Sequence, residues 1–139
     1  MANIRFFFED ITYKVSFPIK TKRWIEEIVK SENFTLHGIN YILCSDEYLL
    51  QINRDYLEHD YYTDIITFDN SESDEAIEGD IFISLERVFE NAKMESVKEE
   101  EELRRVFAHG VLHLCGYNDH TEEEQSLMRQ KEDSYLQQF

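Results

Sequence analysis

The feature that most constrains the fold is a long amphipathic stretch toward the end of the chain, from about Val97 to Cys115. Its apolar residues recur three and four positions apart, which is the spacing of one helix face: Leu103, Val106, Phe107, Val111, Leu112 and Leu114. Gly116 follows directly, and glycine readily adopts the left-handed conformation that ends a helix. The pattern predicts one long helix that buries one face and ends at Gly116.

Strand and helix patterns alternate along the rest of the chain. β-Branched and aromatic residues predict an N-terminal strand or hairpin over 3–17 and short strands over 38–45, 63–69 and 79–85. The last two runs are apolar at nearly consecutive positions, which is typical of central strands. The polar residues 69–79 between them predict a loop.

Helices are predicted after Pro18 and over 46–57 and 85–93. The first of them places four apolar residues on one face: Trp24, Ile25, Ile28 and Val29. Ser45 or Asp46 fits the N-cap of the second. A last helix begins at Thr121, where Glu124 completes a capping-box pattern.

The order of these elements predicts an α+β fold. We expect a single domain over residues 1–139, with a mostly mixed sheet of about four strands covered by about five helices. The hydrophobic content of 42% suits a folded domain with a core of its own. No apolar run approaches the roughly 18 residues that a membrane span needs.

The cysteine content indicates a cellular compartment, and the net charge bears on which partners the chain can bind. Two cysteines, Cys44 and Cys115, and an N-terminus that does not resemble a signal peptide favour a reducing cytoplasm. The net charge of −16 argues by itself against nucleic acid. Residues 1–30 nevertheless carry a balance of +2, which leaves open a local basic surface near the N-terminus.

Three of the five histidines lie within "HGVLHLCGYNDH", residues 109–120. His109 and His113 are four positions apart, so their side chains share one face of the predicted helix. The turn after Gly116 brings His120 back toward that face. Three histidines leave the fourth position of a tetrahedral Zn²⁺ open, which is the catalytic arrangement. The alternative is that these are ordinary helix and turn histidines.

Other residues of the same types are assigned structural roles. His37 and His59 are expected in loops or on the surface, and Cys115 is expected to behave as a buried apolar residue. The spacing of the histidines is similar to the metzincin signature H-E-x-x-H-x-x-G-x-x-H. Gly110 stands where that signature has its general-base glutamate, which weakens a peptidase interpretation.

With these motifs, the chain resembles the YbeY family of bacterial endoribonucleases, whose hallmark is H-G-x-L-H-L-x-G-Y-D-H. The match runs from His109 through Tyr117, after which we take Asn118 as one inserted residue. "INRDYLEHDYYTDIITFDN" (52–70) and "GDIFISLERV" (79–88) are similar to two further family segments. Met128 and Glu132 fall where the last helix of the family has Met and Glu.

The resemblance implies a zinc-dependent, single-strand-specific endoribonuclease that acts in rRNA maturation and ribosome quality control. It makes His109, His113 and His120 the ligands of one Zn²⁺, with Asp119 as a substitute ligand or as a partner that orients an imidazole. Its partners would be an rRNA precursor and the ribosome or its small subunit, in the cytoplasm, with neither DNA nor a membrane involved.

Two departures from the family pattern bear on substrate binding. Leu57 and Tyr62 replace the arginine and the proline of the family segment, and the arginine is the residue thought to face substrate phosphate. Arg54, one helical turn before Leu57, is a candidate replacement, and Lys20, Lys22 and Arg23 are further candidate cations. Asp64 is expected to cap or form the turn before the strand.

Two other functions remain open at this stage. A non-catalytic ribosome-associated protein would use zinc to tie the last two helices together, which the missing arginine and the acidic charge favour. A metallo-hydrolase of another class, such as a peptidase, is the weaker alternative because of Gly110.

Overall fold

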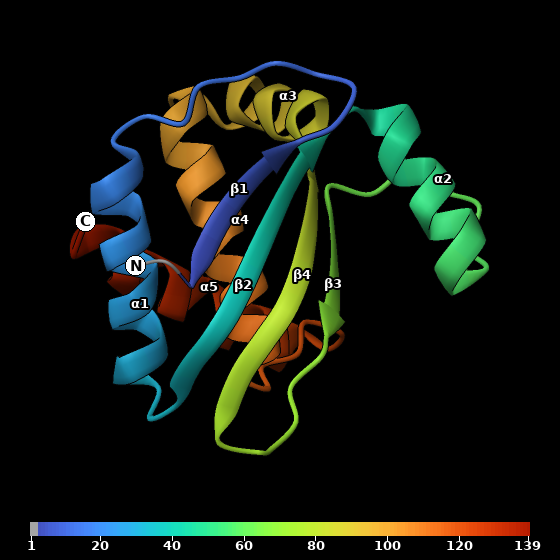
Figure 1. Ribbon diagram of the computed structural model, residues 1–139. Coiled ribbons are helices and arrows are strands. Elements are labelled where there is room, and N and C mark those ends of the chain that lie inside the picture. Colours follow the sequence, from blue (N-terminus) through green and yellow to red (C-terminus); the bar gives the residue numbers. More distant parts are fainter. Residues whose placement is uncertain (1–2) are drawn as a thin grey trace.

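Four strands form one mixed sheet in the order β1–β2–β4–β3 in the computed structural model, which describes residues 3–139 (Figure 1). β1 and β2 pair in parallel, as do β2 and β4, whereas β3 pairs antiparallel with β4. The strands are β1 (Ile4–Phe8), β2 (Thr35–Cys44), β3 (Ile65–Asp69) and β4 (Ala76–Ser84).

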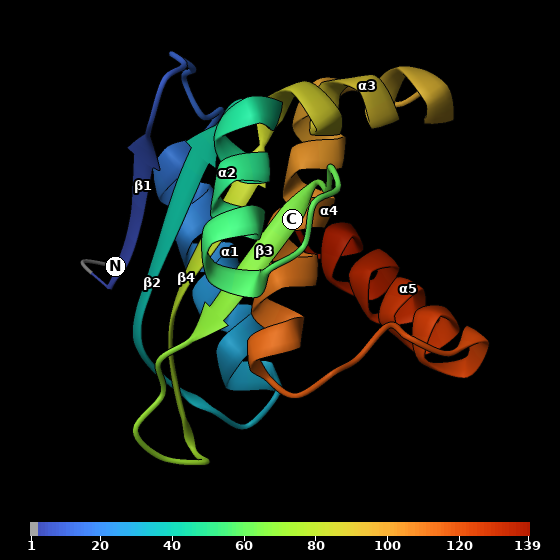
Figure 2. The ribbon, with the colours of Figure 1, turned by 90° about the vertical axis from the view of Figure 1, so that its right-hand side faces the viewer.

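Five helices accompany the sheet: α1 (Pro18–Ser31), α2 (Asp46–Leu57), α3 (Leu85–Glu95), α4 (Glu99–Leu114) and α5 (Glu122–Gln137). α1 and α4 cover one face of the sheet, and α5 packs on the outer side of α4 (Figures 1 and 2). α2 packs on the other face, over β3 and β4. The predicted α+β fold, with its element order, is confirmed.

Most predicted termini follow from local capping. Gly116 has a φ of 102° and directly follows the last turn of α4, as its conformational freedom predicts. Thr121 and Glu124 form the expected capping box of α5. Of the two cap candidates for α2, Ser45 is the N-cap, and its hydroxyl accepts a hydrogen bond from the backbone N–H of Tyr48.

Three details of the strand prediction are wrong. Residues 9–17 form no second strand, so the N-terminal hairpin alternative fails and only β1 is present. β2 and β4 each begin three residues earlier than predicted. The earlier start of β4 shortens the loop between β3 and β4. β3 is an edge strand and not a central one. Its consecutive apolar residues are explained by helices on both faces, because Ile65 packs into the core under α4 and Ile66 into the cluster under α2.

α4 lies very close to the sheet at Gly110. A Cβ atom there would lie 3.0 Å from two atoms of Ile81 and 3.1 Å from Ile65. Packing therefore favours glycine at this position, and the glutamate side chain of a metzincin protease would be directed against Ile81 and Ile65. Among the described helices, none has both the length and the apolar character required to cross a membrane.

Replacing Gly110 with alanine should destabilise the fold. The added methyl group improves helix propensity by about 1 kcal/mol, but overpacking a tight core costs about 1–3 kcal/mol. We expect a net loss of up to about 2 kcal/mol in the free energy of unfolding, measured by urea denaturation. Gly38→Ala is the control, since a Cβ at Gly38 meets its nearest atom at 3.8 Å. Equal stability of the two variants would contradict the packing argument.

Glu102 on α4 makes stability depend on pH. Its side chain is buried with Oε1 unpaired among the described residues, and burial together with the charge of Glu95 raises its pKa to about 7. The folded protein thus holds a proton that the unfolded chain releases near its ordinary value of 4.5. The stability contributed by Glu102 is therefore present below pH 4.5 and is lost as the pH rises through 7.

Glu102→Gln should consequently stabilise the protein at pH 8, by on the order of 1–3 kcal/mol, and have much less effect at pH 5. Thermal and urea unfolding across this range measure the difference. Glu101→Gln, at an exposed position next in the chain, shows the effect of removing one surface charge. A stability gain for Glu102→Gln that does not change with pH would disprove the assignment.

Candidate metal centre

α4 presents His109 and His113 side by side, one helical turn apart, with their Nε2 atoms 3.0 Å from each other. Both side chains are partly buried, at 21% exposure, in the region between α4, α5 and the loop that joins them. Their rings are nearly perpendicular, with centroids 4.5 Å apart. The i,i+4 spacing therefore produces the shared face that the sequence predicts.

The buried carboxylate of Glu132 on α5 orients His109. Its Oε2 lies 2.7 Å from His109 Nδ1, and its Oε1 accepts a hydrogen bond from Arg105 at 2.9 Å. Arg105 also donates to Asp133. Burial lowers the pKa of His109, but the hydrogen bond and charge of Glu132 outweigh it and raise the pKa above its usual value. With a carboxylate at Nδ1, that nitrogen is the donor and Nε2 points into the site.

A backbone carbonyl orients His113. His113 Nδ1 lies 2.8 Å from the carbonyl oxygen of Tyr117, directly after the turn at Gly116. The hydroxyl of Tyr117 donates to Glu32 at the end of α1, and the carboxylate of Glu32 also accepts from Tyr135 and Lys131. Burial and the neighbouring His109 lower the pKa of His113, which favours a neutral imidazole. The second Nε2 is thereby also directed into the site.

Asp119 completes the group. Its Oδ2 lies 3.3 Å from His109 Nε2 and 3.5 Å from His113 Nε2. The three ligand atoms all lie within 4.8 Å of one another. Donors bound to one tetrahedral zinc at 2.0–2.1 Å are about 3.3 Å apart, so the observed spacings of 3.0, 3.3 and 3.5 Å fit such an ion.

The chemistry of the donors supports the same conclusion. Two imidazole lone pairs and one carboxylate converge, and this arrangement is favourable only around a positive charge. A metal ion supplies that charge, and a proton on His109 supplies part of it otherwise. Two imidazoles and a carboxylate are also a ligand set used by catalytic zinc sites.

His120, which we predicted as the third ligand, does not join this group. It is exposed, and its backbone N–H donates to Glu124 at the start of α5. Asp119, the predicted substitute, is the residue that faces the two histidines. Asp119 is ten residues after His109, as is the last histidine of the family hallmark after the first. Counting that spacing without an insertion at Asn118 would have found it.

The other predicted residues lie outside the group. Arg54 is exposed and pairs with Asp60. Asp64 lies directly before β3, where its backbone carbonyl accepts a hydrogen bond from the backbone N–H of Ser84, which is a structural role. The charge of the Asp64 carboxylate also contributes to raising the pKa of His109. His37 and His59 are exposed, as expected, and Cys115 is partly buried.

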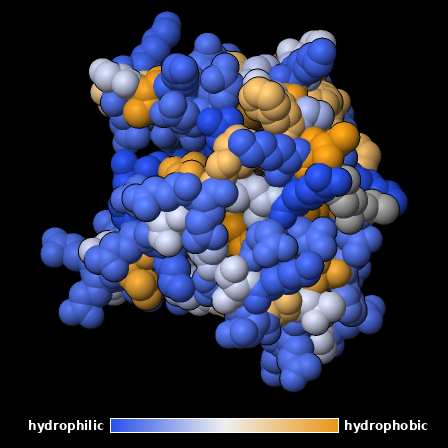
Figure 3. Space-filling view, turned by 90° about the vertical axis from the view of Figure 1, so that its left-hand side faces the viewer, coloured by the Kyte–Doolittle hydropathy of each residue, from blue (hydrophilic) through white to orange (hydrophobic). Residues whose placement is uncertain are grey.

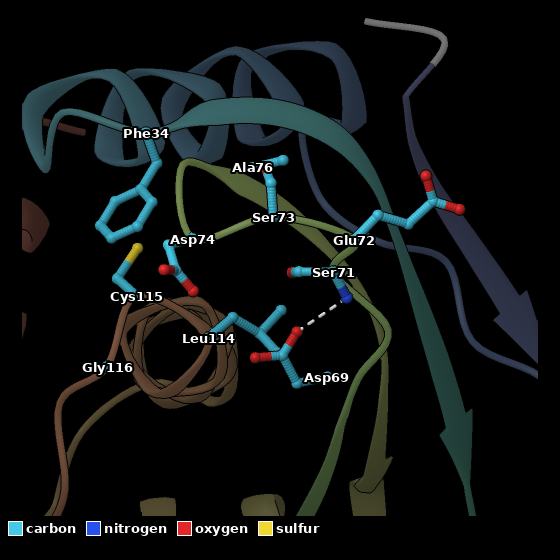
Figure 4. Close-up of a pocket in the computed structure, with 10 residues that line it drawn as sticks. All are labelled: Phe34, Asp69, Ser71, Glu72, Ser73, Asp74, Ala76, Leu114, Cys115 and Gly116. Carbon is cyan, nitrogen blue, oxygen red and sulfur yellow. Dashed lines mark hydrogen bonds between the residues drawn. The ribbon is translucent and has the colours of Figure 1, made fainter.

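A hollow of about 440 Å³ lies beside the C-terminal end of α4, but it does not contain the histidines (Figure 4). Leu114, Cys115 and Gly116 line it on one side, and residues 69–76 of the β3–β4 region on the other. Asp69, Glu72 and Asp74 make this lining acidic. The hollow therefore does not suit a polyanionic substrate, and the metal-binding group remains the candidate site.

Comparison with known proteins identifies close relatives. The family model "Endoribonuclease YbeY" matches residues 8–139. A protein of that name from Cytophaga hutchinsonii is 54% identical over 133 residues, covering 96% of this chain and 93% of its own length. One from Flavobacterium psychrophilum is 50% identical over 131 residues, covering 91% and 93%. The solution structure of TM1509 from Thermotoga maritima is 32% identical, covers 96% and 87%, and superimposes with a TM-score of 0.69.

Glu132→Gln should weaken metal binding without unfolding the protein. Loss of a carboxylate behind a ligating imidazole typically costs 10–100-fold in metal affinity, and we expect a change in that range for zinc, measured by competition with a chromophoric chelator. Asp133→Asn is the matched control, because Asp133 also binds Arg105 but does not contact His109. Equal zinc affinity in the two variants would show that Glu132 does not orient the ligand.

Proposed function

The chain belongs to the YbeY family of endoribonucleases, and on that premise we propose that it is a zinc-dependent endoribonuclease that hydrolyses phosphodiester bonds in single-stranded RNA. The convergence of His109, His113 and Asp119 on one point, with donor spacings of a tetrahedral site, is the observation that carries this proposal.

In this proposal three residues of the chain would hold the ion. His109 and His113 would bind it through Nε2, and Asp119 would bind it through a carboxylate oxygen. Bound zinc would lower the pKa of a coordinated water toward ~7 and polarise a phosphoryl oxygen. Glu132 and the carbonyl of Tyr117 each contact an Nδ1 atom, and these contacts turn the Nε2 atoms of both imidazoles toward the site. The side chains of His109, His113 and Asp119 are only partly buried, so solvent reaches this group.

The substrate that we propose is precursor ribosomal RNA in the cytoplasm, with the ribosome or its small subunit as partner. The family resemblance supports this assignment. Arg54 remains a candidate contact for substrate phosphate, although it would first have to leave Asp60, with which it forms an exposed ion pair. Solvent screens exposed pairs of this kind, so exchanging the carboxylate for a phosphate costs little.

A peptidase fits the structure poorly. Gly110 lies against Ile81 and Ile65, and this packing disfavours a general-base glutamate. A non-catalytic zinc protein is the second candidate, because the three ligands join α4 to the loop before α5. Metal removal separates the two: a chelator should mainly abolish cleavage in the enzyme, whereas it should melt the fold of a protein whose zinc is structural.

Three variants test the ligand set and the activity together. His113→Ala and Asp119→Ala should each lose bound zinc and reduce RNA cleavage at least a hundredfold, whereas His120→Ala should keep both, because His120 is exposed and outside the group. Metal content by mass spectrometry and cleavage of a labelled single-stranded RNA are the measurements. Cleavage at the wild-type rate by His113→Ala would exclude the metal mechanism. Zinc loss in His120→Ala alone would make His120 the third ligand.

A further inference from the structure

The proposed function requires cations that pair with the phosphates of the RNA backbone, and the arginines considered so far are already engaged by carboxylates. Arg105, one turn before His109, is engaged by Glu132 and Asp133. Leu57 stands where the family pattern has an arginine, and Arg54 is paired. With a net charge of −16, the chain repels a polyanion over most of its surface. The cations that hold the substrate must therefore lie elsewhere.

One face of the molecule collects such cations. Lys20, Lys22 and Arg23 lie in the first turns of α1, and Arg104 lies on the adjacent α4. In residues 3–139, no carboxylate lies within 4.0 Å of the charged groups of these four side chains. We call this surface the basic face.

Aromatic rings take the place of carboxylates on the basic face. The Nζ atom of Lys20 lies 4.2 Å from the centroid of the Phe139 ring, and the guanidinium carbon of Arg104 lies 4.3 Å from it. Lys22 lies 5.5 Å from the centroid of Phe6. A ring attracts a cation without neutralising it, so the positive charge of the face remains available to an anion.

Exposed apolar side chains and shallow hollows lie beside the cations of the basic face. Phe17 and Ile19, next to Lys20, are 68% and 57% exposed. Three adjoining hollows of about 440, 250 and 430 Å³ are each lined in part by Lys20, Arg23 or Arg104. Carboxylates also line two of them, Glu101 and Asp133 in the first and Glu27 in the second. Figure 3 views the molecule from this side and shows apolar patches among hydrophilic residues. Cations interleaved with exposed aromatic side chains are the combination that proteins use for single-stranded nucleic acid.

The basic face is separate from the metal centre. Arg104 precedes His109 by five residues, which corresponds to about 7.5 Å along the axis of α4 and a rotation of about 140° around it. His109 and His113 face α5 and the loop before it, whereas Arg104 reaches Phe139 beside α1. Only an RNA that extends well beyond the hydrolysed bond can contact both.

We propose that the basic face binds the backbone of a single-stranded RNA segment outside the cleaved bond. The proposal rests on the proposed function for the identity of the polyanion. Phosphates pair with Lys20, Lys22, Arg23 and Arg104, and exposed Phe17 offers a surface on which a base stacks. The face thereby selects long substrates and compensates for the lack of a free arginine near the zinc ligands.

The test compares two variants that each lose two positive charges. Lys20→Gln/Arg23→Gln removes charge from the basic face. Lys93→Gln/Lys98→Gln removes it from two exposed positions outside that face, in the last turn of α3 and at the N-cap of α4. Zinc-loaded proteins are titrated by fluorescence anisotropy with a 20-nucleotide 2′-O-methyl RNA, shown on a gel to stay intact. Cleavage of 30- and 6-nucleotide RNAs is measured in parallel.

We expect Lys20→Gln/Arg23→Gln to raise the Kd about tenfold and to reduce the slope of log K against log salt by about 1.4, since each lost phosphate contact removes about 0.7. The KM for the 30-nucleotide RNA should rise similarly, with kcat, zinc content and cleavage of the 6-nucleotide RNA unchanged. Lys93→Gln/Lys98→Gln should bind as the wild type does.

Equal weakening in both variants, or in neither, would overturn the proposal. Unchanged RNA binding with weaker binding of poly-glutamate would assign the face to an acidic protein and also overturn it. The proposed function fails independently: if the wild type binds the intact RNA through these residues but cleaves no RNA, then the face is retained and the nuclease assignment is wrong.

Discussion

The close contact between α4 and the sheet at Gly110 is the constraint on which the rest of the structure depends. With Gly110 pressed against Ile81 and Ile65, α4 has one position and one rotation on β3 and β4. That rotation directs residues 106, 107 and 111 into the core and turns His109 and His113 toward α5. The same packing disfavours the glutamate of a protease, so one steric constraint both positions the candidate metal ligands and argues against a peptidase.

The metal centre is held by residues from three further parts of the chain. Glu132 comes from α5, the carbonyl of Tyr117 from the turn after α4, and Glu32 anchors Tyr117 from the end of α1. Burial raises the pKa of Glu32, but its hydrogen bonds from Tyr117, Tyr135 and Lys131 more than offset this and lower it. A charged, fully bonded carboxylate at this point ties α1 and α5 to the turn that carries Asp119.

Charge is divided between two sides of the molecule. Arg105 beside the metal centre and Arg54 on α2 pair with carboxylates of the protein, whereas Lys20 and Arg104 of the basic face contact an aromatic ring and keep their charge. Under the proposed function, repulsion over most of the acidic surface would restrict where an RNA strand lies. Hydrolysis and substrate retention would then belong to separate surfaces.

Local patterns in the sequence determined the helices, their caps and the pairing of His109 with His113, because these depend on 3.6-residue periodicity and on neighbours within one turn. The family resemblance followed from the same short motifs. Only the tertiary structure decided that β3 is an edge strand. Helices cover both of its faces, so it has the consecutive apolar residues that are typical of a central strand. The tertiary structure also decided that Asp119 and not His120 faces the imidazoles, and that Glu132 stands behind His109. Those arrangements arise from how α4, α5 and their loop pack together, and the order of residues along the chain does not specify that packing.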